Sequence, residues 1–380
     1  MENPEALLVL ARARLPDALL RHLLASHDGP AAALAAARHG AGLGLPPACR
    51  QALASPCPRL LAGDLAWLEK PGRQLLAWGS PDYPALLRRT PWPPPVLFLH
   101  GDPSLLWHPQ VALVGSRRPS PGGRQRAHDF AAALAGAGWA VTSGLAEGID
   151  AAAHAGALAV HGRTLAVVGT GLDQAYPPKN AALMARIADQ GLVLGEHPPG
   201  TPAIAAHFPT RNRIVAGLSL GTVVLEAALR SGALISARLA GEAGREVFAM
   251  PGSVDNPVAR GCHRLIRDGA TLVETPAQVV ESLEPLARSL AADLRGALET
   301  GLADAAGACP PGPCGHSAGG QPAVSVNHKR LWSALGHDPT PLDELARRTG
   351  LTVAELSSML LVMELDGQVV ADNGRFARRP

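Results

Sequence analysis

A run of apolar residues at 111–114 ends in the small-residue loop Gly115-Ser116-Arg117, and this pair of features constrains the fold most strongly. An uninterrupted apolar run bounded by turn residues is typical of a strand buried on both faces of a parallel sheet. Beyond the loop, Ser120 and Pro121 suit the start of a helix. Backbone N–H groups and the helix dipole favour an anion at such a junction, and Arg117 adds a guanidinium that binds phosphate. The sequence therefore predicts a phosphate-binding loop, although this loop alone also fits a tight turn with solvated arginines.

Strand-like and helix-like segments alternate between residues 110 and 283. Strands are predicted at 111–114, 139–142, 164–168, 192–194, 222–225, 246–250 and 271–273, and helices at 124–135, 151–159, 181–188 and 233–243. Regular alternation of this kind predicts an α/β fold built on a doubly wound, mostly parallel, Rossmann-like sheet.

Small residues follow four of the predicted strands. These loops are Gly115-Ser116-Arg117, Ser143-Gly144-Leu145, Gly169-Thr170-Gly171 and Gly195-Glu196. In a parallel sheet the carboxyl ends of the strands share one edge, where ligands bind. The alignment of these loops predicts a deep crevice lined by backbone, in which N–H groups at Gly115, Ser143 and Gly171 assist in holding phosphate.

A second cluster of arginines, Arg211-Asn212-Arg213, follows Phe208 at the start of a predicted helix. Two arginines with an amide between them suit consecutive phosphates, and an aromatic face suits a stacked base. The alternative is that Phe208 belongs to the core and that the arginines pair with Glu226 or Asp173.

The crevice shows no recognisable catalytic apparatus. The sequence lacks a Walker A lysine, a complete G-x-G-x-x-G after the first of these strands, a nucleophile elbow and an acidic cluster for a metal. His154 is expected to hydrogen-bond within the seam between a helix and the sheet. We therefore predict a protein that holds phosphates without transforming them, with no metal and no cofactor.

The flanking regions differ in character from this central domain, 110–283. Residues 1–65 read as a small helical domain, similar to SAM-like or helix-hairpin-helix modules, and 66–109 as a connecting segment packed on the core. Residues 284–326 are expected to be largely a flexible linker because 303–326 are rich in Ala, Gly and Pro.

Residues 327–380 predict a C-terminal winged helix, with strands at 368–371 and 375–378 around an Asn-Gly turn. Its last predicted helix, 353–365, contains no Lys or Arg, which argues against sequence-specific reading of duplex DNA. A protein contact, or contact with a DNA backbone through Arg375, Arg378 and Arg379, fits better.

Charge and cysteine content set the broad class. The formal net charge of the 380-residue chain is only +2, so any nucleic-acid site must be a local concentration of arginine. The five cysteines are irregularly spaced, which favours reduced thiols. No apolar stretch is long enough to span a membrane, and the N-terminus does not resemble a signal peptide. We expect a cytoplasmic protein.

Several motifs together resemble the DNA-processing protein A (DprA/Smf) family. They are Val-Gly-Ser-Arg at 114–117, Ser-Gly-Leu-Ala-Glu-Gly-Ile-Asp at 143–150, Gly-Thr-Gly-Leu-Asp at 169–173, Tyr176-Pro177 with Asn180, Phe208 with Arg211-Asn212-Arg213, Ser231-Gly232 with Leu234-Ile235, Pro251-Gly252-Ser253 and Leu265-Ile266. The match is dense over the central domain, clear near residues 83–98 and weaker at both ends.

The resemblance implies a homodimer that binds single-stranded DNA, protects incoming strands and loads the recombinase RecA onto them during natural transformation. The family's phosphate pocket would fall on Gly115, Ser116, Arg117, Ser143, Gly144, Gly171, Phe208, Arg211, Asn212 and Arg213. Its dimer contact would lie near residues 263–272. Two departures are Gly195, where Ser is common, and Thr210, where a basic or other polar residue is common.

Two other functions stay open from sequence alone. One is a nucleotide phosphoribohydrolase with a related sheet, in which Glu226 would be the crevice glutamate. Of the Pro-Gly-Gly-x-Gly-Thr run that precedes the glutamate in those enzymes, only Gly221-Thr222 is present. The other is a protein-interaction adaptor that binds no nucleic acid.

Overall fold

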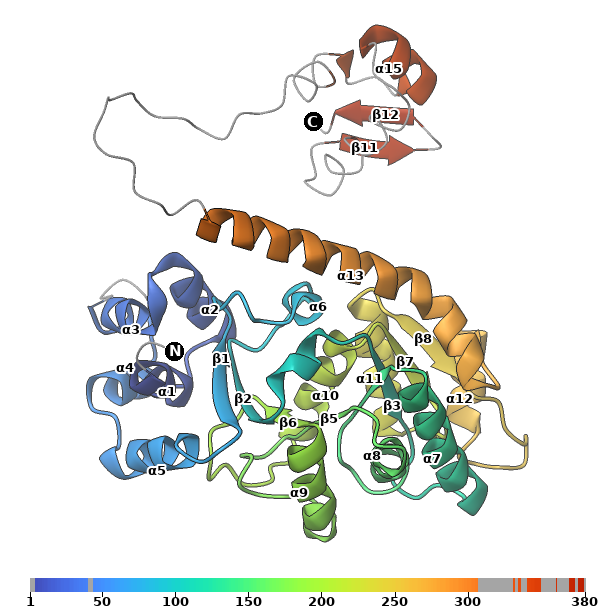
Figure 1. The fold of residues 1–380 in the computed structure, drawn as a ribbon, viewed down its shortest axis with the longest axis horizontal. Helices are drawn as coiled ribbons and strands as arrows, with labels where there is room; N and C mark the ends of the chain where they lie inside the picture. The colour runs from blue at the N-terminus through green and yellow to red at the C-terminus, as the bar shows by residue number, and fades with distance from the viewer. Residues whose placement is uncertain are drawn as a thin grey trace. The chain divides into compact units, whose positions relative to one another are not determined.

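The computed structural model describes residues 4–39 and 44–306, and in the C-terminal part 331, 334, 335, 340–349, 360, 369–372 and 375–378. The chain divides into two compact units, Met1–Ala303 and Asp304–Pro380, and each is described by itself (Figure 1).

A nine-stranded sheet organises the described residues of the first unit, in the order β1-β2-β6-β5-β4-β3-β7-β8-β9. The strands are β1 (Arg73–Ala77), β2 (Val96–Gly101), β3 (Gln110–Val114), β4 (Ala140–Ser143), β5 (Thr164–Val167), β6 (Leu192–Gly195), β7 (Gly221–Val224), β8 (Glu246–Ala249) and β9 (Thr271–Leu272). Strands β3 to β9 pair in parallel, and β2 joins β6 and β1 antiparallel. The predicted doubly wound, mostly parallel sheet is confirmed, with all seven predicted strands present.

Helices cover both faces of this sheet, as the side chains of β3 show. Val111 and Leu113 share a core with α7 (Pro121–Gly136), α8 (Ile149–Ala159) and α13 (Pro276–Ala306). Ala112 and Val114 point to the opposite face and share a core with α10 (His207–Leu218), α11 (Gly232–Glu242) and α12 (Arg260–Arg267). Because successive side chains of a strand alternate between faces, a strand covered on both sides is expected to be largely apolar, as residues 111–114 of β3 are.

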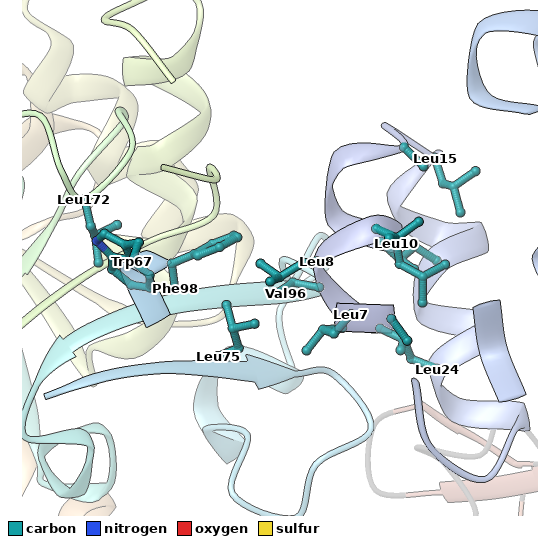
Figure 2. Packing of buried hydrophobic residues seen from close by; sticks show 14 of the residues in the cluster. Leu7, Leu8, Leu10, Leu15, Leu24, Trp67, Leu75, Val96, Phe98 and Leu172 are labelled. Carbon is teal, nitrogen blue, oxygen red and sulfur yellow. The ribbon is translucent and has the colours of Figure 1, made fainter. Parts of the chain in front are cut away.

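The N-terminal helices share one core with the edge of the sheet. They are α1 (Pro4–Arg12), α2 (Asp17–Ser26), α3 (Gly29–His39), α4 (Pro47–Ala54) and α5 (Pro58–Leu68). Leu7 and Leu8 of α1 lie beside Val96, and Trp67 of α5 meets Phe98 edge to face at 6.0 Å between ring centroids (Figure 2). Residues 66–109, predicted as a connecting segment, therefore supply strands β1 and β2 of the sheet. The helical domain and α9 (Ala181–Gln190) share one core with these two strands.

Helix α13 continues through residues 284–306, the first part of the segment predicted as largely linker. Val279 and Leu283 are fully buried against the sheet. Ala287 and Leu290 continue this helical spacing and pack, partly buried, against the same core, which accounts for the persistence of the helix beyond residue 283. Residues 307–326, which carry the Pro/Gly-rich part of the prediction, lie outside the described residues.

The second unit has a small three-stranded antiparallel sheet in its described residues. Strands β10 (Thr340–Pro341), β12 (Arg375–Arg378) and β11 (Val369–Asp372) are adjacent in that order, and α15 (Leu342–Thr349) follows β10. The predicted hairpin is present, with Asp372 opposite Arg375. The predicted helix 353–365 lies outside the described residues except Leu360, which is buried.

His154 lies in the seam between α8 and the sheet, as predicted. Its Nδ1 lies 2.7 Å from Thr164 Oγ1, and that hydroxyl donates to the Val141 carbonyl. Nδ1 must therefore donate to the hydroxyl, which leaves Nε2 unprotonated in the neutral ring. Nε2 is buried and has no hydrogen-bond partner within the described ranges. Burial, with a smaller contribution from Arg211, lowers the pKa of His154 to about 3.

We expect this histidine to make the fold sensitive to acid. Between pH 6.5 and about 3 the unfolded chain binds a proton at residue 154 that the folded chain does not. The free energy of unfolding should therefore fall by about 1.4 kcal/mol for each unit by which the pH is lowered within that window. His154→Asn places a hydrogen-bonding atom near the position of Nδ1 and removes the titration. Urea unfolding at pH 7.5, 6.0 and 5.0 should show a shallower dependence in the variant, and equal dependences would contradict a buried, neutral His154.

Candidate functional site

A cavity of about 760 Å³ lies at the carboxyl ends of β3, β4 and β7. Its walls come from the loop after β3 (114–118), the loop after β4 (144–146), the start of α10 and the N-terminal turn of α11. The predicted crevice is therefore present where the parallel strands end.

Arg211 is the most unusual side chain in this cavity. It is only 4% exposed, and its guanidinium lies flat against Gly144, where a Cβ would fall 1.5 Å from Nη1. Its Nε is buried and has no hydrogen-bond partner in the part of the chain that the structure describes. Burial lowers the pKa of Arg211 to about 10, so the group still carries its charge at neutral pH. A buried cation at the wall of a cavity, with one N–H donor unpaired among the described residues, is an indication of an anionic ligand.

Asp150 lies close to Arg211 but does not neutralise it through a direct ion pair. The carboxylate accepts hydrogen bonds from the backbone N–H groups of Gly144 (3.2 Å) and Ala146 (3.3 Å). Burial raises the pKa of Asp150, and the charge of Arg211 opposes that rise. Asp150 thus fixes the shape of the loop after β4, against which the guanidinium packs.

Two aromatic rings and a second arginine form an adjoining platform. The guanidinium carbon of Arg117 lies 5.9 Å from the centroid of the Phe208 ring, and the Tyr176 ring lies 5.1 Å from Phe208 at 35°. Arg117 is exposed and Tyr176 is 44% exposed. The platform therefore offers an exposed cation and an apolar face to a ligand held by Arg211.

Seven of the ten predicted site residues line this cavity: Gly115, Ser116, Arg117, Gly144, Phe208, Arg211 and Asn212. Ser143 is fully buried beneath it, and its hydroxyl donates to the Leu113 carbonyl at 2.6 Å. Gly171 lies outside the lining, and its N–H donates to the Thr201 carbonyl at 3.0 Å. That N–H is therefore occupied, contrary to the role expected for it in holding phosphate.

Arg213 also lies outside the cavity. Its side chain is 15% exposed, and Nη2 lies 2.5 Å from Glu196 Oε2 and 3.3 Å from Asp17 Oδ2 of α2. The physical reason is helical geometry, because residues two apart on a helix point to different sides. The arginines of 211–213 therefore separate, and Arg213 pairs with carboxylates other than the two considered from sequence.

Glu226, the candidate catalytic glutamate of the alternative enzyme, is engaged at the start of α7. Its carboxylate accepts hydrogen bonds from Ser120 N (2.8 Å) and Ser120 Oγ (2.6 Å), and the side chain is buried. Ser120 Oγ in turn accepts from Gly123 N as the predicted helix cap. Glu226 does not belong to the cavity lining, so its carboxylate acts as a structural acceptor near a positive helix end.

The cavity contains residues that the sequence prediction left out. The main ones are Arg118, Tyr176, Arg230 and the helix start Ser231-Gly232-Ala233. Ser231 caps α11 by accepting from Ala233 N. A cap residue in the loop after the predicted strand 222–225 was the available signal for this wall. Tyr176 had only its place in a motif.

Comparison with protein families matches residues 74–284 to DNA recombination-mediator protein A and residues 317–375 to the DprA winged helix domain. The latter confirms the predicted C-terminal winged helix. None of the helices in the described ranges combines the length and apolar character needed to cross a bilayer.

Similar proteins agree with these matches. The chain is 40% identical to Protein Smf of Escherichia coli K12 over 84% of this chain and 80% of that protein. It is 46% identical to DNA processing protein DprA of Streptococcus pneumoniae R6 over 50% and 67% of the two chains.

Two solved structures are similar to the fold. DNA processing protein A from Streptococcus pneumoniae has a TM-score of 0.65 at 34% identity, covering 74% of this chain and 98% of that one. A structure that concerns the single-stranded DNA binding mode of DNA processing protein A from Helicobacter pylori has a TM-score of 0.51 at 31% identity, covering 56% and 96%. With the family models and relatives of this similarity, the chain belongs to the DNA recombination-mediator protein A family, whose members are called DprA or Smf.

Proposed function

We propose that this protein binds single-stranded DNA in the cavity between β3, β4, α10 and α11, and that it acts in the cytoplasm as a recombination mediator. In this role it would protect incoming strands during natural transformation and load RecA onto them. Membership of the family supports the proposal, as does the relative from Helicobacter pylori whose single-stranded DNA binding mode has been studied.

The observation that carries the proposal is the buried guanidinium of Arg211. Removing a cation from water is costly unless a partner compensates it. Here Nε is without a hydrogen-bond partner and Asp150 is engaged by backbone N–H groups. A phosphate in the cavity would supply the missing acceptors, and exposed Arg117 would close over it.

The aromatic platform would determine how the protein contacts the bases of the bound strand. A base stacked on Phe208 or Tyr176 would contribute about 1–3 kcal/mol whatever its identity. Phosphate contacts fix position without reading sequence. We therefore expect binding that tolerates all sequences and weakens steeply with salt.

We propose that the protein is a homodimer, as the family resemblance implies. Near the expected contact, residues 263–272, lies a second cavity of about 800 Å³ with Leu234 and Leu265 in its lining, and Leu272 is 45% exposed. Pairing two copies would place two phosphate cavities along one strand and raise the overall affinity through effective concentration.

We also propose that the protein is not an enzyme. The phosphoribohydrolase alternative needs a glutamate free to act on a nucleotide, whereas both oxygens of Glu226 accept from Ser120. Release of free base from nucleoside monophosphates by the purified protein would contradict this part of the proposal.

Fluorescence anisotropy of a labelled oligo-dT across a salt titration tests the proposal, with duplex of equal length as competitor. We expect a preference for the single strand and a log affinity that falls by about 0.7 per phosphate contact for each tenfold rise in salt. Arg117→Ala should reduce that slope by about 0.7, because one contact is lost.

Arg186→Ala, an exposed arginine of α9 outside the cavity, is the matched control and should leave the slope unchanged. Absence of binding at low salt would overturn the proposal and return attention to the nucleotide-hydrolase assay.

A further inference from the structure

The segment between β6 and α10, residues 196–206, forms one wall of the cavity. Ala203 and Ala205 of this segment line the cavity, and Phe208 and Arg211 follow directly at the start of α10. The wall has no regular secondary structure over residues 198–204. Its position therefore depends on contacts made by its side chains and backbone with neighbouring elements.

The two ends of this wall are held together at its base. The rings of His197 and His207 stack with centroids 3.9 Å apart at 19°, and His207 Nδ1 lies 3.1 Å from the Gly169 carbonyl. Between these ends, Gly200 N donates to both oxygens of Asp173, at 2.8 and 3.0 Å. These contacts come from the sheet side of the wall.

The N-terminal helical domain holds the same segment from the other side. Arg12 of α1 pairs with Asp64 of α5, whose side chain is 1% exposed, and also donates to the Pro199 carbonyl at 2.8 Å. Arg12 therefore ties the tip of the wall to a buried carboxylate inside the helical domain.

Arg213 connects the helical domain to both the wall and α10. It arises from α10, pairs with Glu196 at the first residue of the wall, and reaches Asp17 at the start of α2. Glu196 and Arg213 are 13% and 15% exposed, and Arg213 Nη1 is buried, with no hydrogen-bond partner among the described residues. An ion pair this well shielded is screened by salt less than a surface pair is.

We infer that Arg213 is a positioning residue, through which the helical domain holds the cavity wall and α10 in the arrangement that binds DNA. The inference rests on the proposed function and adds a role for the N-terminal domain. Arg213 meets no phosphate in this account. Single-stranded DNA affinity depends on it because loss of the Asp17–Arg213–Glu196 contact lets Arg211 leave its position beside Gly144 and Phe208 leave its position beside Gly169.

Arg213→Gln and Asp17→Ala test this account through two independent measurements. In the anisotropy titration, we expect Arg213→Gln to weaken oligo-dT binding by roughly five- to twentyfold and Asp17→Ala by a smaller factor. The salt slope should stay at the wild-type value, because no phosphate contact is removed. The double variant should resemble Arg213→Gln alone, since both changes break one contact.

Hydrogen exchange without DNA provides the second measurement. Amide exchange across residues 196–208 should be faster in both variants than in the wild-type protein. Glu5→Ala, an exposed carboxylate of α1, is the matched control and should change neither measurement. Arg213→Lys should bind DNA more tightly than Arg213→Gln does. The lysine ammonium can still pair with a carboxylate, although it lacks the planar guanidinium that contacts two acceptors at once.

Two outcomes would overturn the inference. A salt slope reduced by about 0.7 in Arg213→Gln would identify a direct phosphate contact. Unchanged exchange and unchanged affinity in a folded Arg213→Gln would show that the contact positions nothing. Failure of the proposed function would give a different result. The wild-type protein would bind no DNA, while the exchange experiment would still report on the Asp17–Arg213–Glu196 contact.

Discussion

Replacing Arg211 with alanine is expected to weaken oligo-dT binding by about thirtyfold or more. Truncating one member of a buried, charge-assisted contact typically costs about 2–5 kcal/mol. Arg211 is 4% exposed, and its Nε has no hydrogen-bond partner among the described residues. The measurement is the dissociation constant from anisotropy at one low salt concentration, with circular dichroism to confirm folding. Binding at wild-type affinity would mean that the guanidinium serves only to compensate Asp150.

Gly144→Ala separates binding from charge compensation. The added Cβ would fall 1.5 Å from Arg211 Nη1, so the flexible end of the arginine must move toward the cavity. The charge stays in the protein, but the guanidinium leaves the position that the loop after β4 defines. We expect affinity to fall almost as far as in Arg211→Ala, with a smaller loss of thermal stability.

Gly156→Ala is expected to cause the largest loss of stability among the glycine substitutions in the helices that cover the sheet. Helices α7 and α8 approach closely here: a Cβ at Gly156 would fall 2.0 Å from the His128 carbonyl oxygen. Backbone on both sides must then separate, because neither helix can move a side chain out of the way. We expect a loss of about 2–3 kcal/mol, seen as a melting temperature lower by roughly 5–10 °C.

Gly241→Ala in α11 is the matched control, since a Cβ there meets nothing within 4 Å. That change should raise stability by about 0.5–1 kcal/mol through helix propensity alone. If Gly156→Ala melted at the wild-type temperature, α7 and α8 could not be in contact at this position.

The central sheet was predictable because most of its strands are apolar on both faces and four of the seven predicted strands end in small residues. That pattern located β3 and its loop, and with it the cavity that holds Gly115, Arg117 and Arg211. The aromatic platform was half visible: Phe208 was predicted, but Tyr176 was not assigned to the site. The sequence identifies residue 176 as a tyrosine in a loop. How close its ring lies to the start of α10 depends on packing, which the sequence does not show.

Two differences between the sequence prediction and the structure have physical causes. The sequence places Arg213 with Arg211 at the phosphate site, whereas in the structure its side chain pairs with Glu196 and Asp17, because residues two apart on a helix point to different sides. Strands β1 and β2 were not predicted; β2 pairs with β6, about a hundred residues away, and β1 pairs with β2. Non-local pairings of this kind leave no periodic signal in the strand itself.

The core shared by the N-terminal helices and the edge strands affects how the helical domain can be studied. Leu75, Val96 and Phe98 are at most 3% exposed because α1 and α5 cover them. A protein shortened to begin near β1 would expose these side chains on the outermost strands of the sheet, a surface that invites aggregation. Loss of DNA binding after such a deletion would therefore report misfolding rather than a missing binding domain. Point changes in polar contacts, which leave this apolar seam closed, are the informative route to the function of the helical domain.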